Sequence, residues 1–232
     1  MSDADPLGRR SRETCRCGVS GRLPVRVIHM VGEATPATIV LPIGTEGGSR
    51  TLNRLPTLDP VSGLLPPGRY SASLEELHAL LVAPMGSPTR EELWQEWERH
   101  RAVVSAFAGE ITRVWVGGSF VSAKPDPSDV DVTYLLRAEA YDRLDRETLV
   151  YLDELTLRAW CVDNDMRVDA HLVRLPERMA VSEMLPSLLQ RRTSESFRDI
   201  GIYDELWQCT RGASGSNGTP GELRRGYVEV LL

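Results

Sequence analysis

The stretch from residue 114 to residue 132 reads VWVGGSFVSAKPDPSDVDV. An apolar run ends in Gly-Gly-Ser at residues 117–119, and ten positions after the serine comes Asp129, followed by Val130 and Asp131. Residues two apart on a strand point to the same side. Asp129 and Asp131 are therefore expected to place both carboxylates on one face, while Val130 and Val132 point into the core.

Apolar runs on either side of this stretch predict three strands, over residues 111–116, 130–136 and 166–175. Asp169 interrupts the third run between two small apolar residues. If the third strand lies beside the second, the carboxylate of Asp169 completes a cluster of three acids.

Clustered carboxylates repel one another and destabilise the fold unless a cation neutralises them. Hard oxygen ligands of this kind suit Mg²⁺ or Mn²⁺, which also bind phosphate oxygens. Two such ions about 3.5–4 Å apart would fit a three-acid cluster. Asp129, Asp131 and Asp169 are thus the predicted metal ligands and catalytic residues.

The Gly-Gly-Ser element is suited to binding phosphates. Gly118 lets the backbone approach a phosphate closely, although Gly117 could serve as the motif glycine instead, and the Ser119 hydroxyl with nearby amides can hold terminal phosphates. Lys124 is the single lysine in the chain. It can meet a phosphate as a point charge, and a solvated loop lysine is equally consistent with its position.

This pattern resembles a known superfamily. An apolar strand followed by Gly118-Ser119, then Asp129-x-Asp131 and a later strand aspartate, Asp169, is similar to the DNA polymerase beta-like nucleotidyltransferases. In that superfamily the first two aspartates bind metal, the third acts as a base or ligand, and Gly-Ser contacts the nucleotide phosphates. The resemblance implies a metal-dependent nucleotidyltransferase with Mg²⁺ or Mn²⁺ as cofactor and an NTP such as ATP as substrate.

A wider likeness covers about residues 58–232 and points to an uncharacterised bacterial and phage branch. It includes residues 64–68, Lys124-Pro125, residues 168–170 and residues 226–230. Antitoxin-type and aminoglycoside-modifying relatives commonly carry an Arg and a Gly shortly after Gly-Ser, where this chain has Ser122 and Ala123. Their substrates therefore do not transfer directly to this chain.

The expected reaction moves a nucleoside monophosphate to an acceptor hydroxyl and releases pyrophosphate. An RNA end, a protein and a small molecule are all compatible acceptors, and a protein partner is compatible too. Two alternatives stay open at this point. One is a non-catalytic or regulatory protein of the same fold in a toxin–antitoxin or phage-defence system; the other is a glycosyltransferase that uses Asp-x-Asp.

Composition sets limits on these readings. The chain has 232 residues, of which 41% are hydrophobic and 26% charged, as in soluble globular proteins. A net charge of −6 argues against sequence-independent binding of long duplexes, but it allows a nucleotide or one RNA end. No apolar stretch approaches the roughly 20 residues that cross a bilayer, and four cysteines make no disulfide scaffold at this length. We expect a cytoplasmic protein.

The predicted fold class is α+β, with a small mixed sheet flanked by helices as in the nucleotidyltransferase fold. Residues 1–50 are rich in Gly, Pro, Ser, Thr and Arg and are expected to form a disordered leader; a start codon assigned too far upstream, with Met30 as an internal candidate, would also explain them. The domain is expected over residues 58–232, with a core at 111–175 and C-terminal helices and a strand at 177–232.

Helices are expected where capping signals precede a helical apolar pattern. Ser73 with Glu76, and Thr89 with Glu92, have capping-box spacing. The remaining expected elements are a helix up to residue 82, a helix over 87–109, one long helix over 139–160, helical segments over 181–192 and 194–207, a strand over 227–232, and weak strands over 23–31 and 38–43.

Several other residues have two readings. His171 shares the face of Asp169 and could orient it, but a structural histidine is favoured. Arg191, Arg192 and Arg198 could bind phosphates, but a solvated helix face is favoured. The tryptophans at positions 94, 97, 160 and 207 are expected to pack in the core or against the C-terminal segment, and Cys161 is expected to be buried.

Overall fold

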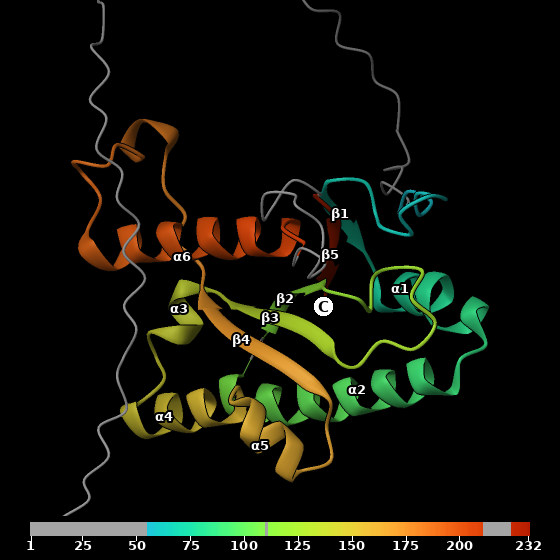
Figure 1. Ribbon diagram of the computed structural model, residues 1–232. Coiled ribbons are helices and arrows are strands. Elements are labelled where there is room, and N and C mark those ends of the chain that lie inside the picture. The colour runs from blue at the N-terminus through green and yellow to red at the C-terminus, as the bar shows by residue number, and fades with distance from the viewer. Residues whose placement is uncertain (1–54, 110, 211–223) are drawn as a thin grey trace, which may run out of the picture. The chain divides into compact units, whose positions relative to one another are not determined.

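A five-stranded mixed sheet organises the computed structural model, which describes residues 55–109, 111–210 and 224–232. The strand order is β1-β5-β2-β3-β4, and helices lie on both sides of the sheet (Figure 1). This confirms the expected α+β class with a mixed sheet flanked by helices. The strands are β1 (Gly68–Ala72), β2 (Ile111–Gly117), β3 (Val130–Leu136), β4 (Val168–Arg174) and β5 (Gly226–Leu231).

The half of the sheet that carries the predicted acids follows the sequence closely. β2 and β3 are antiparallel, and β3 and β4 are parallel neighbours. In the β3–β4 register Asp131 lies opposite Asp169. The predicted adjacency of these two strands is therefore confirmed.

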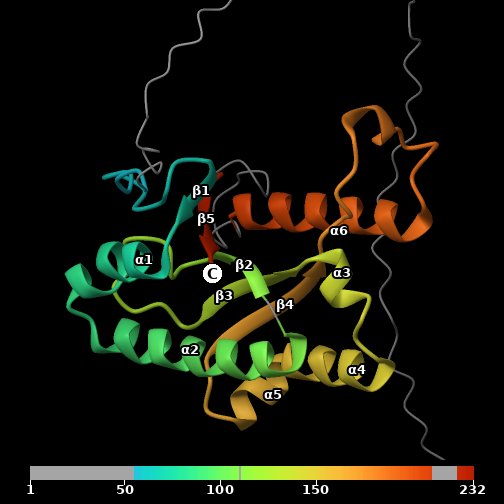
Figure 2. The same ribbon diagram turned by 180° about the vertical axis from the view of Figure 1, so that it is seen from behind.

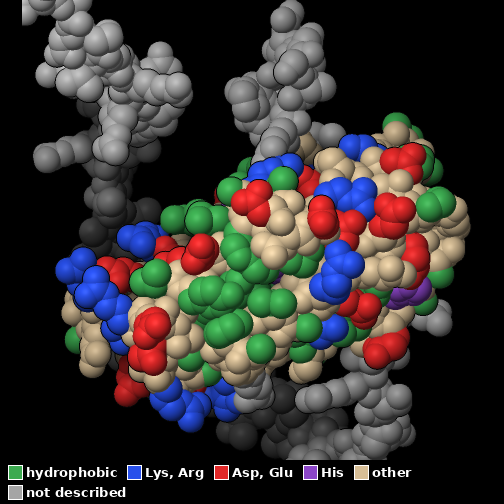
Figure 3. Space-filling model, turned by 90° about the horizontal axis from the view of Figure 1, so that it is seen from below, with side chains coloured by type: hydrophobic (Ala, Val, Ile, Leu, Met, Phe, Trp, Pro, Cys, Tyr) green, Lys and Arg blue, Asp and Glu red, His purple; other side chains and the backbone are tan. Residues whose placement is uncertain are grey.

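The helices form two layers. In Figures 1 and 2, α2 (Pro88–Ala108), α4 (Arg146–Leu155) and α5 (Arg158–Asp163) lie below the sheet, and α6 (Arg191–Gln208) lies above it. The main core fills the lower side, where Trp97, Val132 and Leu152 are fully buried. A smaller apolar cluster fills the α6 side, where Trp207 packs near Trp115 and Leu135. Seen from below, hydrophobic side chains gather near the middle of the α2–α4–α5 face and charged side chains surround them (Figure 3).

The first two helices begin at serine caps. The predicted capping box is present at α1 (Leu74–Leu81), where Ser73 and Glu76 each satisfy a backbone amide of the other. The predicted Thr89 cap of α2 is wrong, because the side chain of Ser87 accepts the Arg90 amide instead and Pro88 occupies the first helical position. Near the end of α2, Phe107 is 43% exposed and packs against Tyr151.

The single long helix predicted over residues 139–160 is wrong. The segment forms three helices, α3 (Ala138–Tyr141), α4 and α5. Asp145 begins α4 by accepting the Thr148 amide at 2.7 Å, and such a side chain competes with helix continuation. The breaks let Leu152, Leu155 and Cys161 all reach the core.

Other expectations need correction too. Residues 181–192 contain only the short 3-10 turn η2 (Val181–Glu183) before α6 begins at Arg191, and a second 3-10 turn, η1 (Ala83–Met85), follows α1. The strand β1 was not predicted at all; it pairs in parallel with β5. The expected leader over 1–50 and the weak strands over 23–31 and 38–43 lie outside the described residues. No helix in the described part of the chain is both long and apolar enough to cross a bilayer.

Candidate active site

A pocket of about 530 Å³ opens on the α6 side of the sheet, where β3 and β4 begin. This volume lies within the range of small-molecule sites. The residues predicted from the sequence that line it are Gly118, Ser119, Lys124, Asp129, Asp131, Asp169 and His171. Two regions of the chain that are distant in sequence, 118–131 and 169–171, thus contribute to a single pocket.

Asp131 and Asp169 form the centre of the site. They are register partners on parallel strands, whose backbones lie about 4.8 Å apart. Their neighbours Val130, Val132 and Ala170 are buried in the opposite face of the sheet. The alternation of each strand therefore directs both carboxylates to the same side, where one cation could be shared between them.

Asp129 lies at the edge of the same pocket and is held differently. Its carboxylate accepts a hydrogen bond from the Ser128 hydroxyl at 3.0 Å and pairs with the Arg158 guanidinium of α5 at 3.2 Å. Among the described residues, no three His, Cys, Asp or Glu side chains are grouped closely enough to hold a metal ion as they stand. The Arg158 guanidinium provides a positive charge beside the Asp129 carboxylate.

The glycines after β2 have separate roles. Gly118 adopts a φ of +68°, and a Cβ built there would lie 1.5 Å from Oδ2 of Asp131. No side chain could occupy that position without displacing the carboxylate. A Cβ on Gly117 would lie 2.8 Å from the Trp207 ring, so this glycine allows α6 to pack against the sheet. Gly118 is therefore the glycine that faces the pocket, and Gly117 does not line it.

The sequence profile of DUF6932, described as a family of unknown function, matches residues 56–231. The chain belongs to this family. The DUF6932 match includes every residue that lines the carboxylate pocket. No curated protein and no solved structure matches the chain.

A buried arginine holds the loop between Gly118 and Lys124 in this DUF6932 chain. Arg90 of α2 is fully buried, and its guanidinium donates to the carbonyls of Leu81, Phe120, Ser122 and Lys124 at 2.6–2.8 Å. Burial lowers the pKa of Arg90, and the charge of Asp126 opposes that effect. Sequence reasoning missed this residue because its partners are backbone carbonyls, which leave no pattern in a sequence.

The α6 wall of the pocket is aromatic. The His171 ring lies 4.9 Å from the ring of Tyr203 and 6.0 Å from that of Trp207, centroid to centroid. Burial lowers the pKa of His171, and the nearby Asp169 charge opposes the shift. The Trp207 indole donates to the Thr133 hydroxyl at 2.9 Å, which fixes α6 over the sheet. His171 is thus packed as part of the wall, as well as sharing the face of Asp169.

The other candidate cations of the DUF6932 chain divide between the pocket and the surface. Lys124 lines the pocket and is exposed. Arg191, Arg192 and Arg198 do not line it; they pair with Glu195, Asp142 and Asp199 on the surface. The two described cysteines also differ, since Cys161 is buried as expected and Cys209 lies at the pocket.

Proposed function

We propose that this chain is a metal-dependent nucleotidyltransferase that moves a nucleoside monophosphate from an NTP to an acceptor hydroxyl. The observation that carries the proposal is the register of β3 and β4, which puts Asp131 directly opposite Asp169 in the pocket that Gly118 and Ser119 also line. A strand, a Gly-Ser turn, an Asp-x-Asp strand and a third acidic strand in this order support the nucleotidyltransferase fold within the observed mixed sheet.

Carboxylate oxygens are the donors that a hard divalent cation prefers, although the three aspartates of the described pocket are not gathered closely enough to hold one as they stand. Asp131 and Asp169 supply carboxylate oxygens from adjacent strands, and Asp129 supplies a third group at the pocket edge. These three residues would hold Mg²⁺ or Mn²⁺, which prefer such oxygens. When bound, the ion would neutralise triphosphate oxygens and lower the pKa of an attacking hydroxyl.

The remaining pocket residues have roles that follow from their positions. Gly118 carries no side chain, and the Asp131 carboxylate lies where its Cβ would be, so a phosphate bound to a cation on Asp131 would lie close to the backbone amides there. The Ser119 hydroxyl and the Lys124 ammonium both line the pocket and can donate to phosphate. Arg90 is buried, does not line the pocket, and holds the loop that carries these groups.

The bond changes are those of a displacement at phosphorus. The acceptor oxygen forms a new bond to the α-phosphorus, the bond from that phosphorus to the bridging oxygen breaks, and pyrophosphate leaves. The proton of the acceptor hydroxyl passes to a base or to solvent. The rings of His171 and Trp207 line the pocket, and a nucleobase could stack on them.

The test has a binding arm and a transfer arm. In the first, Mn²⁺-dependent binding of each NTP is measured by calorimetry, with Asp131→Asn and Asp169→Asn as variants. In the second, NTPs labelled at the α-phosphate are incubated with RNA, with the protein itself and with hydroxyl-bearing small molecules. Transfer should fall at least about 100-fold in both variants, as when a charge-stabilising group is removed from a catalytic site.

Asp163→Asn is the matched control, since Asp163 is an exposed aspartate at the end of α5 and does not line the pocket. It should behave as the unmodified protein does. Transfer that persists in Asp131→Asn and Asp169→Asn would refute the site assignment. An absence of any Mn²⁺-dependent NTP binding would refute the proposed function itself.

A further inference from the structure

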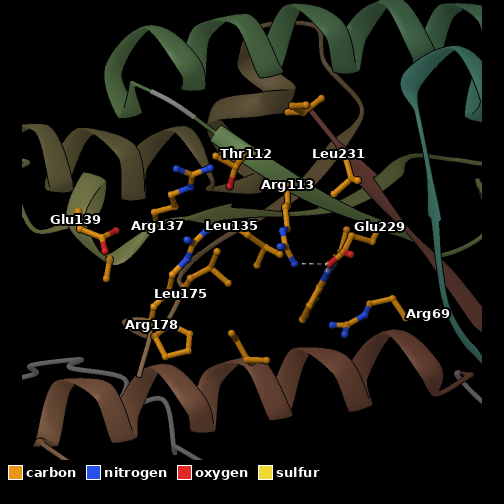
Figure 4. A pocket seen from close by; sticks show the side chains of 15 residues that line it. Arg69, Thr112, Arg113, Leu135, Arg137, Glu139, Leu175, Arg178, Glu229 and Leu231 are labelled. Atoms are coloured by element: carbon orange, nitrogen blue, oxygen red, sulfur yellow. Dashed lines mark hydrogen bonds and ion pairs between the residues drawn. The ribbon is translucent and has the colours of Figure 1, made fainter. Parts of the chain in front are cut away.

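A second cavity lies on the same face of the sheet, between the sheet and the first half of α6 (Figure 4). Its volume is about 490 Å³, close to that of the carboxylate pocket, yet its chemistry is the opposite. Four arginines line it, Arg69 from β1, Arg113 from β2, Arg137 after β3 and Arg178 after β4, against two glutamates. The net charge of the whole protein is −6, so this cavity differs in sign from the chain as a whole.

The positive charge of the cavity is largely uncompensated. Arg113 lies 3.6 Å from the Glu229 carboxylate. Within the described residues, no carboxylate comes within ion-pair distance of Arg69, Arg137 or Arg178. Like charges gathered in this way raise the free energy of the fold unless an anion joins them. The cavity therefore has a net attraction for an anionic ligand.

Two of these arginines are held in place by buried groups. Glu229 is only 8% exposed; it accepts a hydrogen bond from the Trp115 indole at 3.1 Å and also faces Arg113. The Arg69 guanidinium lies 5.4 Å from the centroid of the Trp115 ring. Such positioning reduces the entropy that the arginines lose when a ligand binds. A planar guanidinium binds phosphate oxygens in pairs, which favours phosphate over a simple halide.

The middle of the cavity is apolar. In Figure 4 Arg113 and Arg69 lie on the side of Glu229, Arg137 and Arg178 lie on the side of Glu139, and Leu135 lies between the two groups. Leu175 and Ile200 add further apolar lining. A ligand that fills this space would place an anionic group on guanidinium and lay an apolar or ring portion on the leucines.

This cavity is separate from the carboxylate pocket. The two share no lining residue, and the contact between Trp207 and Thr133 stands between them. Along β3, Asp131 of one and Leu135 of the other are four residues apart, or about 13 Å. A single small ligand cannot occupy both sites.

We propose that the arginine-lined cavity is a second binding site, one that takes a small organic phosphate with an apolar or ring portion. This inference stands apart from the proposed nucleotidyl transfer, because none of its residues belongs to the carboxylate pocket. Charge at the guanidinium groups sets the affinity for the phosphate. Contact with Leu135, Leu175 and Ile200 favours an organic phosphate over the inorganic ion.

The experiment is calorimetric titration of the full chain in EDTA, which keeps divalent cations away from the carboxylate pocket. The probes are phenyl phosphate, a nucleoside monophosphate and inorganic phosphate. We expect phenyl phosphate or the nucleoside monophosphate to bind with a Kd of about 1 mM or tighter, corresponding to roughly −4 kcal/mol. Inorganic phosphate should bind at least about 10-fold more weakly, because burial of the ring adds roughly 1.5 kcal/mol or more.

The double variant Arg137→Ala/Arg178→Ala should weaken binding at least about 10-fold, since it removes two of the four guanidinium charges of the cavity. Both side chains are exposed, so the variant should fold. The control is Arg146→Ala, an exposed arginine of α4 outside both cavities, and it should leave the affinity unchanged. Three results would overturn the proposal: no binding of either organic phosphate, equal binding of inorganic phosphate, or a double variant that binds like the control.

Discussion

Replacement of the buried arginine, Arg90→Ala, should destabilise the protein severely. The guanidinium donates five hydrogen bonds to four backbone carbonyls, those of Leu81, Phe120, Ser122 and Lys124. Its bonds to the first three are fully buried. A buried acceptor left without a donor costs about 1–3 kcal/mol. Removal of the arginine also removes the cost of burying its charge, which offsets part of this penalty. We therefore take about 1 kcal/mol for each of the three buried carbonyls and expect the free energy of unfolding to fall by about 3 kcal/mol.

Equilibrium unfolding in urea measures this loss. With a slope of about 2 kcal/mol per molar, the midpoint should fall by roughly 1.5 M. Arg99→Ala is the control on the same helix, because Arg99 is exposed and, within the described part of the chain, donates one hydrogen bond, to the Asp165 carbonyl at 3.0 Å. It should cost less than about 1 kcal/mol. If Arg90→Ala costs no more than Arg99→Ala, the guanidinium does not hold the loop and the reasoning is refuted.

Two further predictions concern a glycine and a histidine. Gly118→Ala should abolish nucleotidyl transfer and destabilise the fold, since its Cβ would meet the Asp131 carboxylate. The control Gly201→Ala, at a position in open space on α6, should instead stabilise the fold by about 0.5–1 kcal/mol. Equal effects of the two substitutions on stability would contradict this account. Burial lowers the pKa of His100, whose ring nitrogens lie 2.7 Å from the Tyr134 hydroxyl oxygen and 2.9 Å from the Leu155 carbonyl oxygen. Below about pH 6.5 His100 becomes protonated in the unfolded chain but stays neutral in the folded chain. The free energy of unfolding therefore decreases as the pH is lowered, by up to about 1.4 kcal/mol per pH unit. Urea titrations between pH 7.5 and 5 should show a shallower slope for His100→Gln, and an unchanged slope would count against the assignment.

The region around the acids could be predicted from sequence because its signals are local. Val130, Val132 and Tyr134 alternate with Asp131 and Thr133, so that β3 was predicted with its observed bounds. Alternation also fixes which face each carboxylate takes. The pairing of Asp131 with Asp169 needed one further assumption, that the third strand lies beside the second, and the structure bears it out.

The features that could not be predicted from the sequence depend on contacts between segments that are distant in sequence. The segment GRYSA of β1 has no clear apolar alternation and becomes a strand because β5 offers it a parallel neighbour. The breaks in the 139–160 region let Leu152, Leu155 and Cys161 all reach the core, and that packing depends on the rest of the fold. The arginine cavity is assembled from four separate segments, none of which has a motif of its own.

The pairing of β1 with β5 has a consequence for how the chain folds. Among the described strands β1 pairs only with β5. Residues 68–72 can therefore pair only after residues 226–231, which follow all the other described strands in sequence, have reached them. Long-range pairings of this kind form late in folding, because the intervening chain loses conformational entropy before stabilising contacts have formed. The β2–β3–β4 region with α2 can collapse first around local contacts. We therefore expect a folding intermediate in which the carboxylate pocket is largely shaped while the arginine cavity, which needs β1 and β5, does not yet exist.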